Sequence, residues 1–145
     1  MITFDLVTLI DRPVHDVFAF VTDLSNMHRW QSTAQEIKPV SGKPMGVGAT
    51  FTVKGEMLGR KLEGLLEIVE YEPDSKFGYR GKMGPVTVGA VMTFSKAGTG
   101  TKLSMSGKGE PGGFFKIAEG VLAGRIKAQM EGNLSRLKSV LESGA

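Results

Sequence analysis

Cysteine is absent from the 145 residues, histidine occurs twice and tryptophan once. The absence of cysteine excludes disulfide bonds, thiolate zinc sites and cysteine nucleophiles, and two histidines argue against a histidine-rich metal centre. No apolar run approaches the roughly 20 residues of a membrane-spanning helix. The first residues carry neither the basic nor the apolar stretch of a secretory signal. We therefore expect a soluble, cytoplasmic protein.

The net charge is also small, because 18 basic and 15 acidic residues give a value of only +3. Many of the lysines alternate with apolar residues, which indicates a solvated outer sheet face; they are Lys54, Lys61, Lys76, Lys82, Lys102 and Lys108. Aromatic residues do not interleave with them as stacking on nucleic acid requires, so no nucleic-acid partner is expected. Contact of this basic face with a membrane or a larger complex is an alternative use.

Glycine, in contrast, is abundant, with 20 residues where the average share would be about ten. It suits turns, bulges and walls that a ligand or another backbone approaches closely. Hydrophobic residues make up 41% of the chain, and a chain of this length buries about two-thirds of its surface on folding. The composition therefore predicts one domain over residues 1–145.

The hydrophobic pattern changes its period along the chain. Residues 2–10 are β-branched and apolar, as in a strand, and apolar residues at helical spacing after Pro13 predict a short helix, followed by a second short turn. Residues 34–109 alternate between apolar and polar types, with turns between the runs, which predicts an antiparallel meander. From Gly113 to Glu142 the period is helical, and about 29 residues would form one helix roughly 43 Å long. Its apolar stripe consists of Ala118, Leu122, Ile126, Met130, Leu134, Leu137 and Leu141.

Residues 110–115 join the last strand to this helix and contain Gly112 and Gly113 followed by Phe114 and Phe115. The glycine pair permits motion, so the two phenylalanines could form a lid. The simpler interpretation is a bulge and the start of the helix.

Several short motifs resemble those of one superfamily in the same order along the chain. They are Ile10-Asp11-Arg12-Pro13 with Val17-Phe18, Thr22-Asp23 followed by Trp30, Gly46-Val47-Gly48, Gly100-Thr101-Lys102-Leu103, and Leu134-Ser135-Arg136-Leu137-Lys138. Together they resemble the START-like (SRPBCC) superfamily, which includes the birch-pollen-allergen and polyketide cyclase/dehydrase families.

This resemblance implies an α+β helix-grip fold. In such a fold a curved antiparallel sheet of about six to seven strands wraps around one long C-terminal helix, and two short helices follow the first strand. The gap between sheet and helix holds a hydrophobic ligand. Similar proteins include lipid carriers, cyclases, dehydratases and co-chaperone modules, so the fold does not name one chemistry. A monomer or weak homodimer is expected.

The residues expected to line the gap face inward by strand alternation or helical spacing, and several are methionines, whose thioethers adapt to variable ligand shapes. They are Val53, Met57, Leu62, Leu66, Phe77, Tyr79, Met83, Val88, Met92, Met105, Phe115, Ala118, Leu122 and Ile126, with Trp30 at the mouth. The function predicted is binding or transport of a small hydrophobic molecule, such as a lipid, quinone, polyketide or aromatic, without a cofactor.

A polyketide cyclase- or dehydratase-like enzyme is the alternative function. Its candidate acid–base residues are Tyr79, which faces inward, Glu119, which lies beside the helical stripe at the expected cavity end, and His28 near Trp30. Neither histidine belongs to a spaced cluster of carboxylates and imidazoles, so no metal site is expected.

Overall fold

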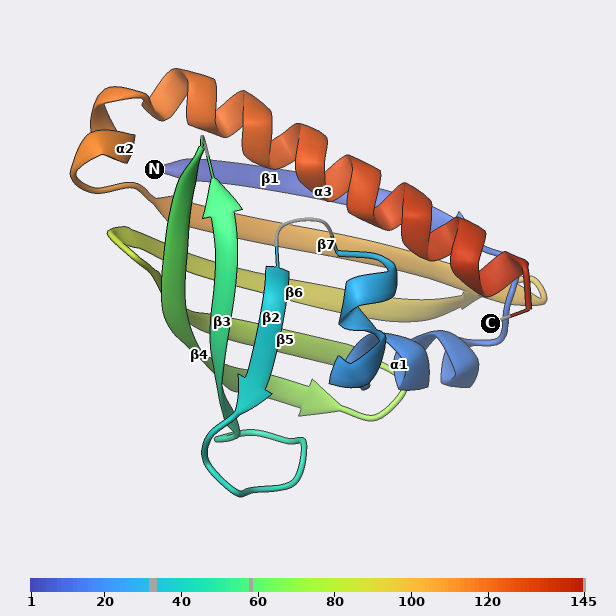
Figure 1. Ribbon diagram of the computed structural model, residues 1–145. Coiled ribbons are helices and arrows are strands. Elements are labelled where there is room, and N and C mark those ends of the chain that lie inside the picture. Colours follow the sequence, from blue (N-terminus) through green and yellow to red (C-terminus); the bar gives the residue numbers. More distant parts are fainter. Residues whose placement is uncertain (32–33, 58, 145) are drawn as a thin grey trace.

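The computed structural model describes residues 1–31, 34–57 and 59–144. One seven-stranded antiparallel sheet, in the order β1-β7-β6-β5-β4-β3-β2, curves around a long C-terminal helix (Figure 1). The elements are β1 (Ile2–Ile10), α1 (Val14–Thr22), the 3-10 helix η1 (Leu24–Arg29), β2 (Ala34–Pro39), β3 (Thr50–Met57), β4 (Arg60–Glu72), β5 (Lys76–Met83), β6 (Val86–Ala97), β7 (Gly100–Glu110), α2 (Phe114–Ile117) and α3 (Glu119–Glu142). This arrangement confirms the helix-grip fold.

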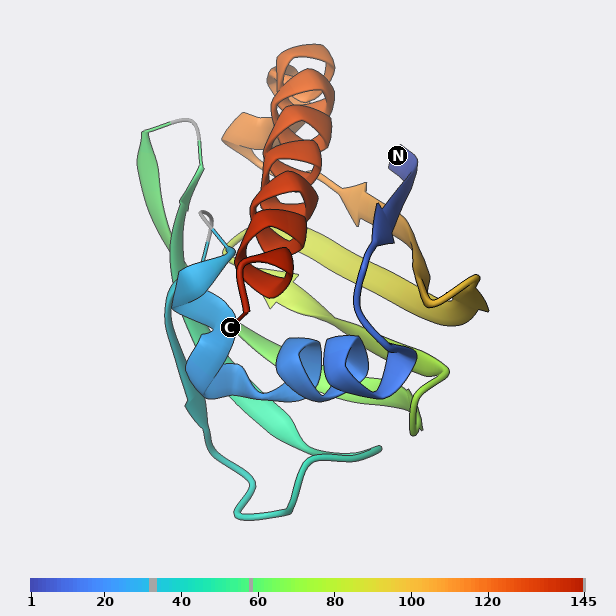
Figure 2. The same cartoon turned by 90° about the vertical axis from the view of Figure 1, so that its right-hand side faces the viewer.

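The two short helices connect the two edge strands of the sheet. Helix α1 follows Pro13 and buries Val17, Phe18 and Val21, as its apolar spacing predicts. Helix η1 begins after Asp23, whose carboxylate accepts a hydrogen bond from the backbone N–H of Ser25 at 3.0 Å, a typical N-terminal cap. Seen from the side in Figure 2, α3 stands within the curve of the sheet, and α1 and η1 lie beneath its C-terminal end.

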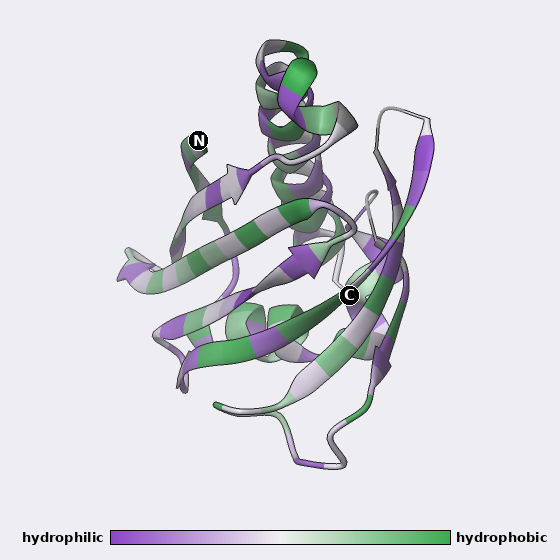
Figure 3. Cartoon of the chain, turned by 90° about the vertical axis from the view of Figure 1, so that its left-hand side faces the viewer, coloured by the Kyte–Doolittle hydropathy of each residue, from purple (hydrophilic) through white to green (hydrophobic). Residues whose placement is uncertain are grey.

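Alternation along the strands divides the sheet into an inner and an outer face. Along β7, buried residues such as Leu103 and Met105 alternate with exposed ones such as Lys102 and Lys108. Figure 3 shows the same alternation of hydrophobic and hydrophilic residues on several strands. The inner face packs against α1 and α3, and the lysines of the outer face meet solvent. None of the described helices is both long and apolar enough to cross a membrane.

The prediction of one continuous helix from Gly113 to Glu142 is wrong. The helix is interrupted at Ala118, where φ is −96° and ψ is 21°. Helix α3 therefore has 24 residues, about 36 Å at 1.5 Å per residue. The break lets α2 turn back, and Phe115 becomes 1% exposed in a cluster with Ile2 and Val86. Phe115 is thus part of the core and not a free lid, and the side chain of Phe114 lies outside the described part.

Two glycines allow β4 and β5 to approach closely where the sheet curves. A Cβ atom at Gly64 would clash with the carbonyl oxygen of Lys82, and one at Gly81 with the carbonyl oxygen of Leu65. The backbone therefore occupies the space that a side chain would need. This role matches the expectation that glycine suits places that another backbone approaches closely.

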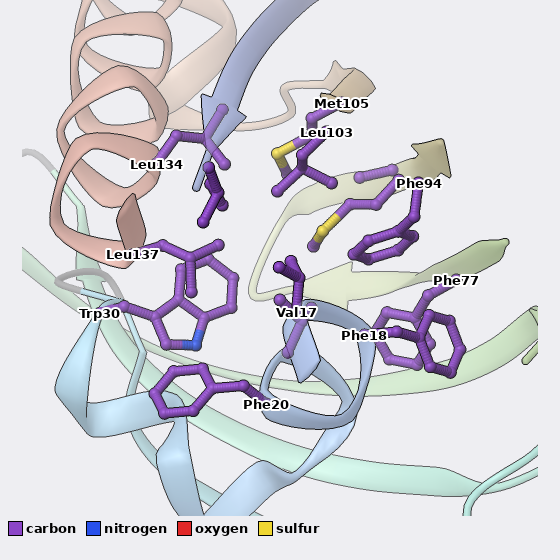
Figure 4. Packing of buried hydrophobic residues seen from close by; sticks show 14 of the residues in the cluster. Val17, Phe18, Phe20, Trp30, Phe77, Phe94, Leu103, Met105, Leu134 and Leu137 are labelled. Carbon is purple, nitrogen blue, oxygen red and sulfur yellow. The ribbon is translucent and has the colours of Figure 1, made fainter. Parts of the chain in front are cut away.

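The hydrophobic core consists of two clusters at opposite ends of the inner face. The larger cluster surrounds α1 and the C-terminal half of α3, and Figure 4 shows Trp30, Phe18 and Leu137 within it. The smaller cluster consists of Ile2, Leu62, Val86, Phe115, Leu122 and Ile126. Phe4 and Met130 pack against both clusters, and a cavity lies where they meet.

Candidate functional site

A cavity of about 140 Å³ lies between the inner face of the sheet and α3, and it is partly open to solvent. Its wall is formed by residues of all seven strands, helix α3, helix η1 and the chain just after η1. The lining residues are Phe4, Leu24, Met27, Gln31, Ile37, Phe51, Val53, Glu56, Leu62, Leu66, Ile68, Phe77, Tyr79, Met83, Val88, Gly89, Ala90, Lys108, Gly109, Ile126 and Met130. Apolar side chains dominate this wall.

The cavity arises because inward positions on the central strands carry small residues. One cross-strand row runs Ile68, Tyr79, Ala90, Gly107 and Phe4, in register from β4 to β1. Ala90 and Gly107 fill little space, and the ring of Phe4 lies directly over Gly107, where it would clash with a Cβ atom. The floor of the cavity is therefore low at Ala90, between the side chain of Tyr79 and the ring of Phe4.

The next row continues this hollow. It runs Leu66, Gly81, Val88, Gly109 and Ile2. Gly109 is buried between exposed neighbours in the sequence, so a side chain at this position would point inward. Its Cβ atom would have only the carbonyl oxygen of Thr87 nearby, at 3.7 Å. A larger residue at position 109 would project into the cavity.

The row on the other side of Tyr79 is filled by large side chains. It runs Tyr71, Phe77, Met92, Met105 and Leu6. Met92 and Met105 are 1% and 2% exposed and belong to the larger core cluster. Only Phe77 of this row reaches the cavity, so the row forms the boundary between the cavity and the closely packed core.

The structure divides the residues expected to line the gap into two groups. Val53, Leu62, Leu66, Phe77, Tyr79, Met83, Val88 and Ile126 line the cavity. Trp30, Met92, Met105, Phe115, Ala118 and Leu122 do not, and the side chain of Met57 lies outside the described part. Binding of a ligand by the first group stays a prediction.

Packing elsewhere in the core explains why the residues of the second group do not line the cavity. Trp30 is 1% exposed, packs in the larger cluster, and accepts a hydrogen bond from Arg136 through its carbonyl oxygen at 3.2 Å. It is therefore a core residue, not a residue of the cavity mouth. Phe115 and Leu122 fill the smaller cluster, and Ala118 marks the break between α2 and α3.

Most of the lining residues that the sequence did not single out are of two kinds. Phe51, Ile68 and Ala90 lie at inward strand positions, and Met130 lies on the helical stripe, so their periodicity was a usable signal. The second kind comes from the segment between β1 and β3. Leu24 and Met27 lie on η1, Gln31 lies two residues after the end of η1, and Ile37 lies on β2. Their contribution depends on how η1 packs beside the sheet, which periodicity does not reveal.

Tyr79 is the hydroxyl-bearing side chain of the cavity wall. Desolvation by burial raises its pKa to about 12, because a phenolate loses its hydration among apolar side chains. Within the described residues, its hydroxyl has no hydrogen-bond partner. The phenol is therefore neutral at physiological pH, and its O–H group donates no hydrogen bond within the described residues.

The other two candidate acid–base residues lie away from the cavity wall. Glu119 is 40% exposed and pairs with the amino group of Met1 at 3.2 Å, so its expected position at the cavity end is wrong. His28 lies exposed on η1. Apart from Tyr79, the ionisable lining residues among those described are Glu56 and Lys108, both with exposed side chains.

A second polar contact between α3 and the chain after η1 lies beside the cavity. The buried side chain of Asn133, 1% exposed, donates to Oε1 of Gln31 at 3.3 Å and to Sδ of Met130 at 3.9 Å. Gln31 and Met130 both line the cavity. The Gln31 amide oxygen is therefore already engaged. In the described part of the chain, no three His, Asp or Glu side chains gather where a metal ion could bind.

A sequence model of the family described as "Polyketide cyclase / dehydrase and lipid transport" matches residues 1–142. The chain belongs to this family. Membership confirms the START-like resemblance and supports a ligand-binding domain, but it does not name a ligand. No curated protein sequence matches the chain significantly.

Several solved structures share the fold over nearly their whole length. TTHA0849 from Thermus thermophilus has a TM-score of 0.83 at 16% identity, with 99% of each chain covered. DR_A0006 from Deinococcus radiodurans has a TM-score of 0.76 at 15% identity, with 100% of each chain covered. Ara h 8.0201 has a TM-score of 0.74 at 17% identity, with 98% of each chain covered. At these identities the similarity shows the fold alone.

Proposed function

We propose that this family member binds or carries a small hydrophobic molecule, of the lipid, quinone, polyketide or aromatic type, in the cavity between sheet and α3. The observation that carries the proposal is an unfilled apolar cavity, partly open to solvent. Protein interiors are otherwise packed almost without voids, and apolar concave sites with few polar groups are typical of small-molecule binding.

The size of the cavity limits the part of a ligand that it can enclose. Its volume is about 140 Å³, and an apolar cavity of about 150 Å³ in an engineered protein core binds benzene. One ring or a short branched chain therefore fits inside. A longer molecule would extend through the open side.

Binding is better supported than a cyclase- or dehydratase-like reaction. Such a reaction needs a proton donor or acceptor with a pKa near the working pH. Of the three candidates only Tyr79 lines the cavity, and its pKa of about 12 suits a hydrogen-bond donor and not a general base at neutral pH.

A cavity-filling substitution tests the proposal. N-phenylnaphthylamine is uncharged and becomes fluorescent in apolar surroundings, so its titration reports binding with one ring inside the cavity and the rest extending through the open side. Gly109→Leu places a side chain in the space beside Thr87 and should weaken probe binding about tenfold or more, because little of the cavity would remain.

Gly132→Leu is the matched control. Gly132 lies exposed on α3 with no heavy atom within 4 Å of an added Cβ, so this variant adds the same side chain away from the cavity and should bind the probe as the wild type does. Circular dichroism checks that both variants fold. Equal probe affinity for a folded Gly109→Leu variant and the wild type would contradict binding in this cavity.

A further inference from the structure

We propose that the ligand is an uncharged apolar molecule with one hydrogen-bond acceptor, such as a carbonyl or ether oxygen, which the hydroxyl of Tyr79 binds. This inference rests on the proposed ligand-binding function. It adds the chemical class of the ligand and the residue that selects it.

The first argument is the unsatisfied donor. Tyr79 is half-buried and lines the partly open cavity, and its hydroxyl has no hydrogen-bond partner within the described residues. Its neighbours in the cross-strand row are Ile68 and Ala90, which offer only apolar side chains. A ligand oxygen in the cavity would satisfy the donor.

The second argument is the protonation state of the phenol. Burial raises the pKa of Tyr79 to about 12, so the hydroxyl keeps its proton and can donate. A neutral phenol in a wall of low polarity favours an acceptor on the ligand. The ligand oxygen therefore completes an otherwise apolar contact surface.

The third argument concerns charge. A buried ion needs an opposite charge or several hydrogen bonds to replace its hydration. The lining includes Glu56 and Lys108, whose exposed side chains alternate with buried residues along β3 and β7 and remain hydrated. It also includes Gln31, whose amide oxygen accepts a hydrogen bond from Asn133. Nothing described in the interior of the cavity would compensate an ionised ligand.

Two probes of similar shape separate the hydrogen bond from general apolar binding. Acetophenone carries a carbonyl acceptor, and ethylbenzene lacks it. Both are titrated into isotope-labelled wild type and Tyr79→Phe protein, and amide chemical shifts give the affinities. Tyr79→Phe should weaken acetophenone binding about three- to tenfold, the usual effect of one neutral hydrogen bond, and leave ethylbenzene binding unchanged.

Tyr71→Phe is the matched control, because Tyr71 is the other tyrosine of the chain and does not line the cavity. It should leave the affinity ratio of the two probes unchanged. Benzoate, the charged analogue, should bind the wild type at least about tenfold more weakly than acetophenone, because its charge would be buried without a partner.

A spectroscopic measurement keeps the proposal testable even if the Tyr79→Phe variant folds poorly. The carbonyl stretching band of acetophenone bound to the wild type should lie at lower frequency than in an alkane solvent, as expected for a hydrogen-bonded carbonyl. An alkane-like band position would overturn the inference.

The remaining outcomes distinguish this inference from the proposed function. If both probes bind but Tyr79→Phe leaves their affinity ratio unchanged, the selective role of Tyr79 is wrong and the binding function stands. If benzoate binds as tightly as acetophenone, the restriction to uncharged ligands is wrong. If neither neutral probe binds the wild type, both the proposed function and this inference fail.

Discussion

Tyr79 is a polar residue that the fold keeps in an apolar wall, and this position changes how it ionises. Its pKa is raised to about 12 from an ordinary value of 10.0 because burial desolvates the phenolate. The unfolded chain would release this proton near the ordinary value, whereas the folded protein retains it. The contribution of the protonated Tyr79 to the free energy of unfolding is therefore complete below about pH 10 and is lost as the pH rises toward about 12.

We expect the free energy of unfolding of the wild type to fall more steeply between about pH 9.5 and 11.5 than that of Tyr79→Phe, which has no phenol to ionise at this position. Urea unfolding at a series of pH values measures this difference. Tyr71→Phe should retain the steeper slope that Tyr79 causes. Parallel slopes for the wild type and Tyr79→Phe would show that the phenol is not desolvated.

At the scale of elements, strands β4 and β5 approach each other closely in the sheet that forms the cavity floor. Gly64 and Gly81 lie where the backbones of these strands leave no room for a Cβ atom. Because the neighbouring atoms are backbone carbonyl oxygens, they cannot move aside as a side-chain end can. The close approach of the two strands thus depends on the absence of side chains at two positions.

Gly81→Ala should therefore destabilise the protein by about 1–3 kcal/mol, the usual cost of overpacking. Gly89→Ala, on the adjacent strand β6, is the matched control. Its nearest atom would be the carbonyl oxygen of Tyr79 at 3.5 Å, so the free energy of unfolding should change by less than about 1 kcal/mol. Chemical denaturation measures both values, and similar stabilities for the two variants would refute this account of the close approach of β4 and β5.

At the scale of the whole molecule, polar contacts join the C-terminal end of α3 to the loop between β1 and α1. The backbone N–H of Asp11 donates to the Glu142 carboxylate at 2.8 Å, and Arg12 donates to the carbonyl oxygen of Leu141 at 2.8 Å. Lys138 pairs with Glu142 at 2.7 Å. These contacts connect segments near the two ends of the chain and hold α3 across the open side of the sheet.

The pH dependence of Glu142 tests this connection. Hydrogen bonds from Lys138 and from the backbone of Asp11 lower its pKa below the ordinary value of 4.5. Its stabilising effect is therefore present above about pH 4.5 and is lost as the pH falls through the lowered pKa. Glu142→Gln should reduce the loss of melting temperature on acidification from about pH 5 to pH 3, relative to the wild type.

Glu131→Gln, which changes an exposed glutamate of the same helix, is the control for the Glu142 experiment. It should retain the acid sensitivity of the wild type. If Glu142→Gln loses melting temperature on acidification as steeply as the wild type, the contacts at the end of α3 do not contribute measurably to stability.

Local patterns predicted the elements better than they predicted the cavity. Alternation identified the inward strand residues, and the family motifs indicated the helix-grip fold, because both signals are contained in short stretches of sequence. The break at Ala118 was missed, since its residues continue a helical pattern and only the burial of Phe115 in the smaller cluster accounts for the turn. Met92 and Met105 were assigned to the cavity wall because inward residues of the core and of the cavity have the same periodicity.

The sequence by itself determined the order of the elements, the inner and outer faces of the sheet, and the presence of Tyr79 on the inner face. Only the tertiary structure decided where the inner face is filled and where it is hollow. The reason is that packing depends on side chains brought into register from different strands: Ala90 and Gly107 lie in one row with Tyr79, whereas Met92 and Met105 lie in the next. Strand pairing therefore placed Ala90 beside Tyr79 and Gly109 beside Val88, and the cavity lies over Ala90 and Gly109.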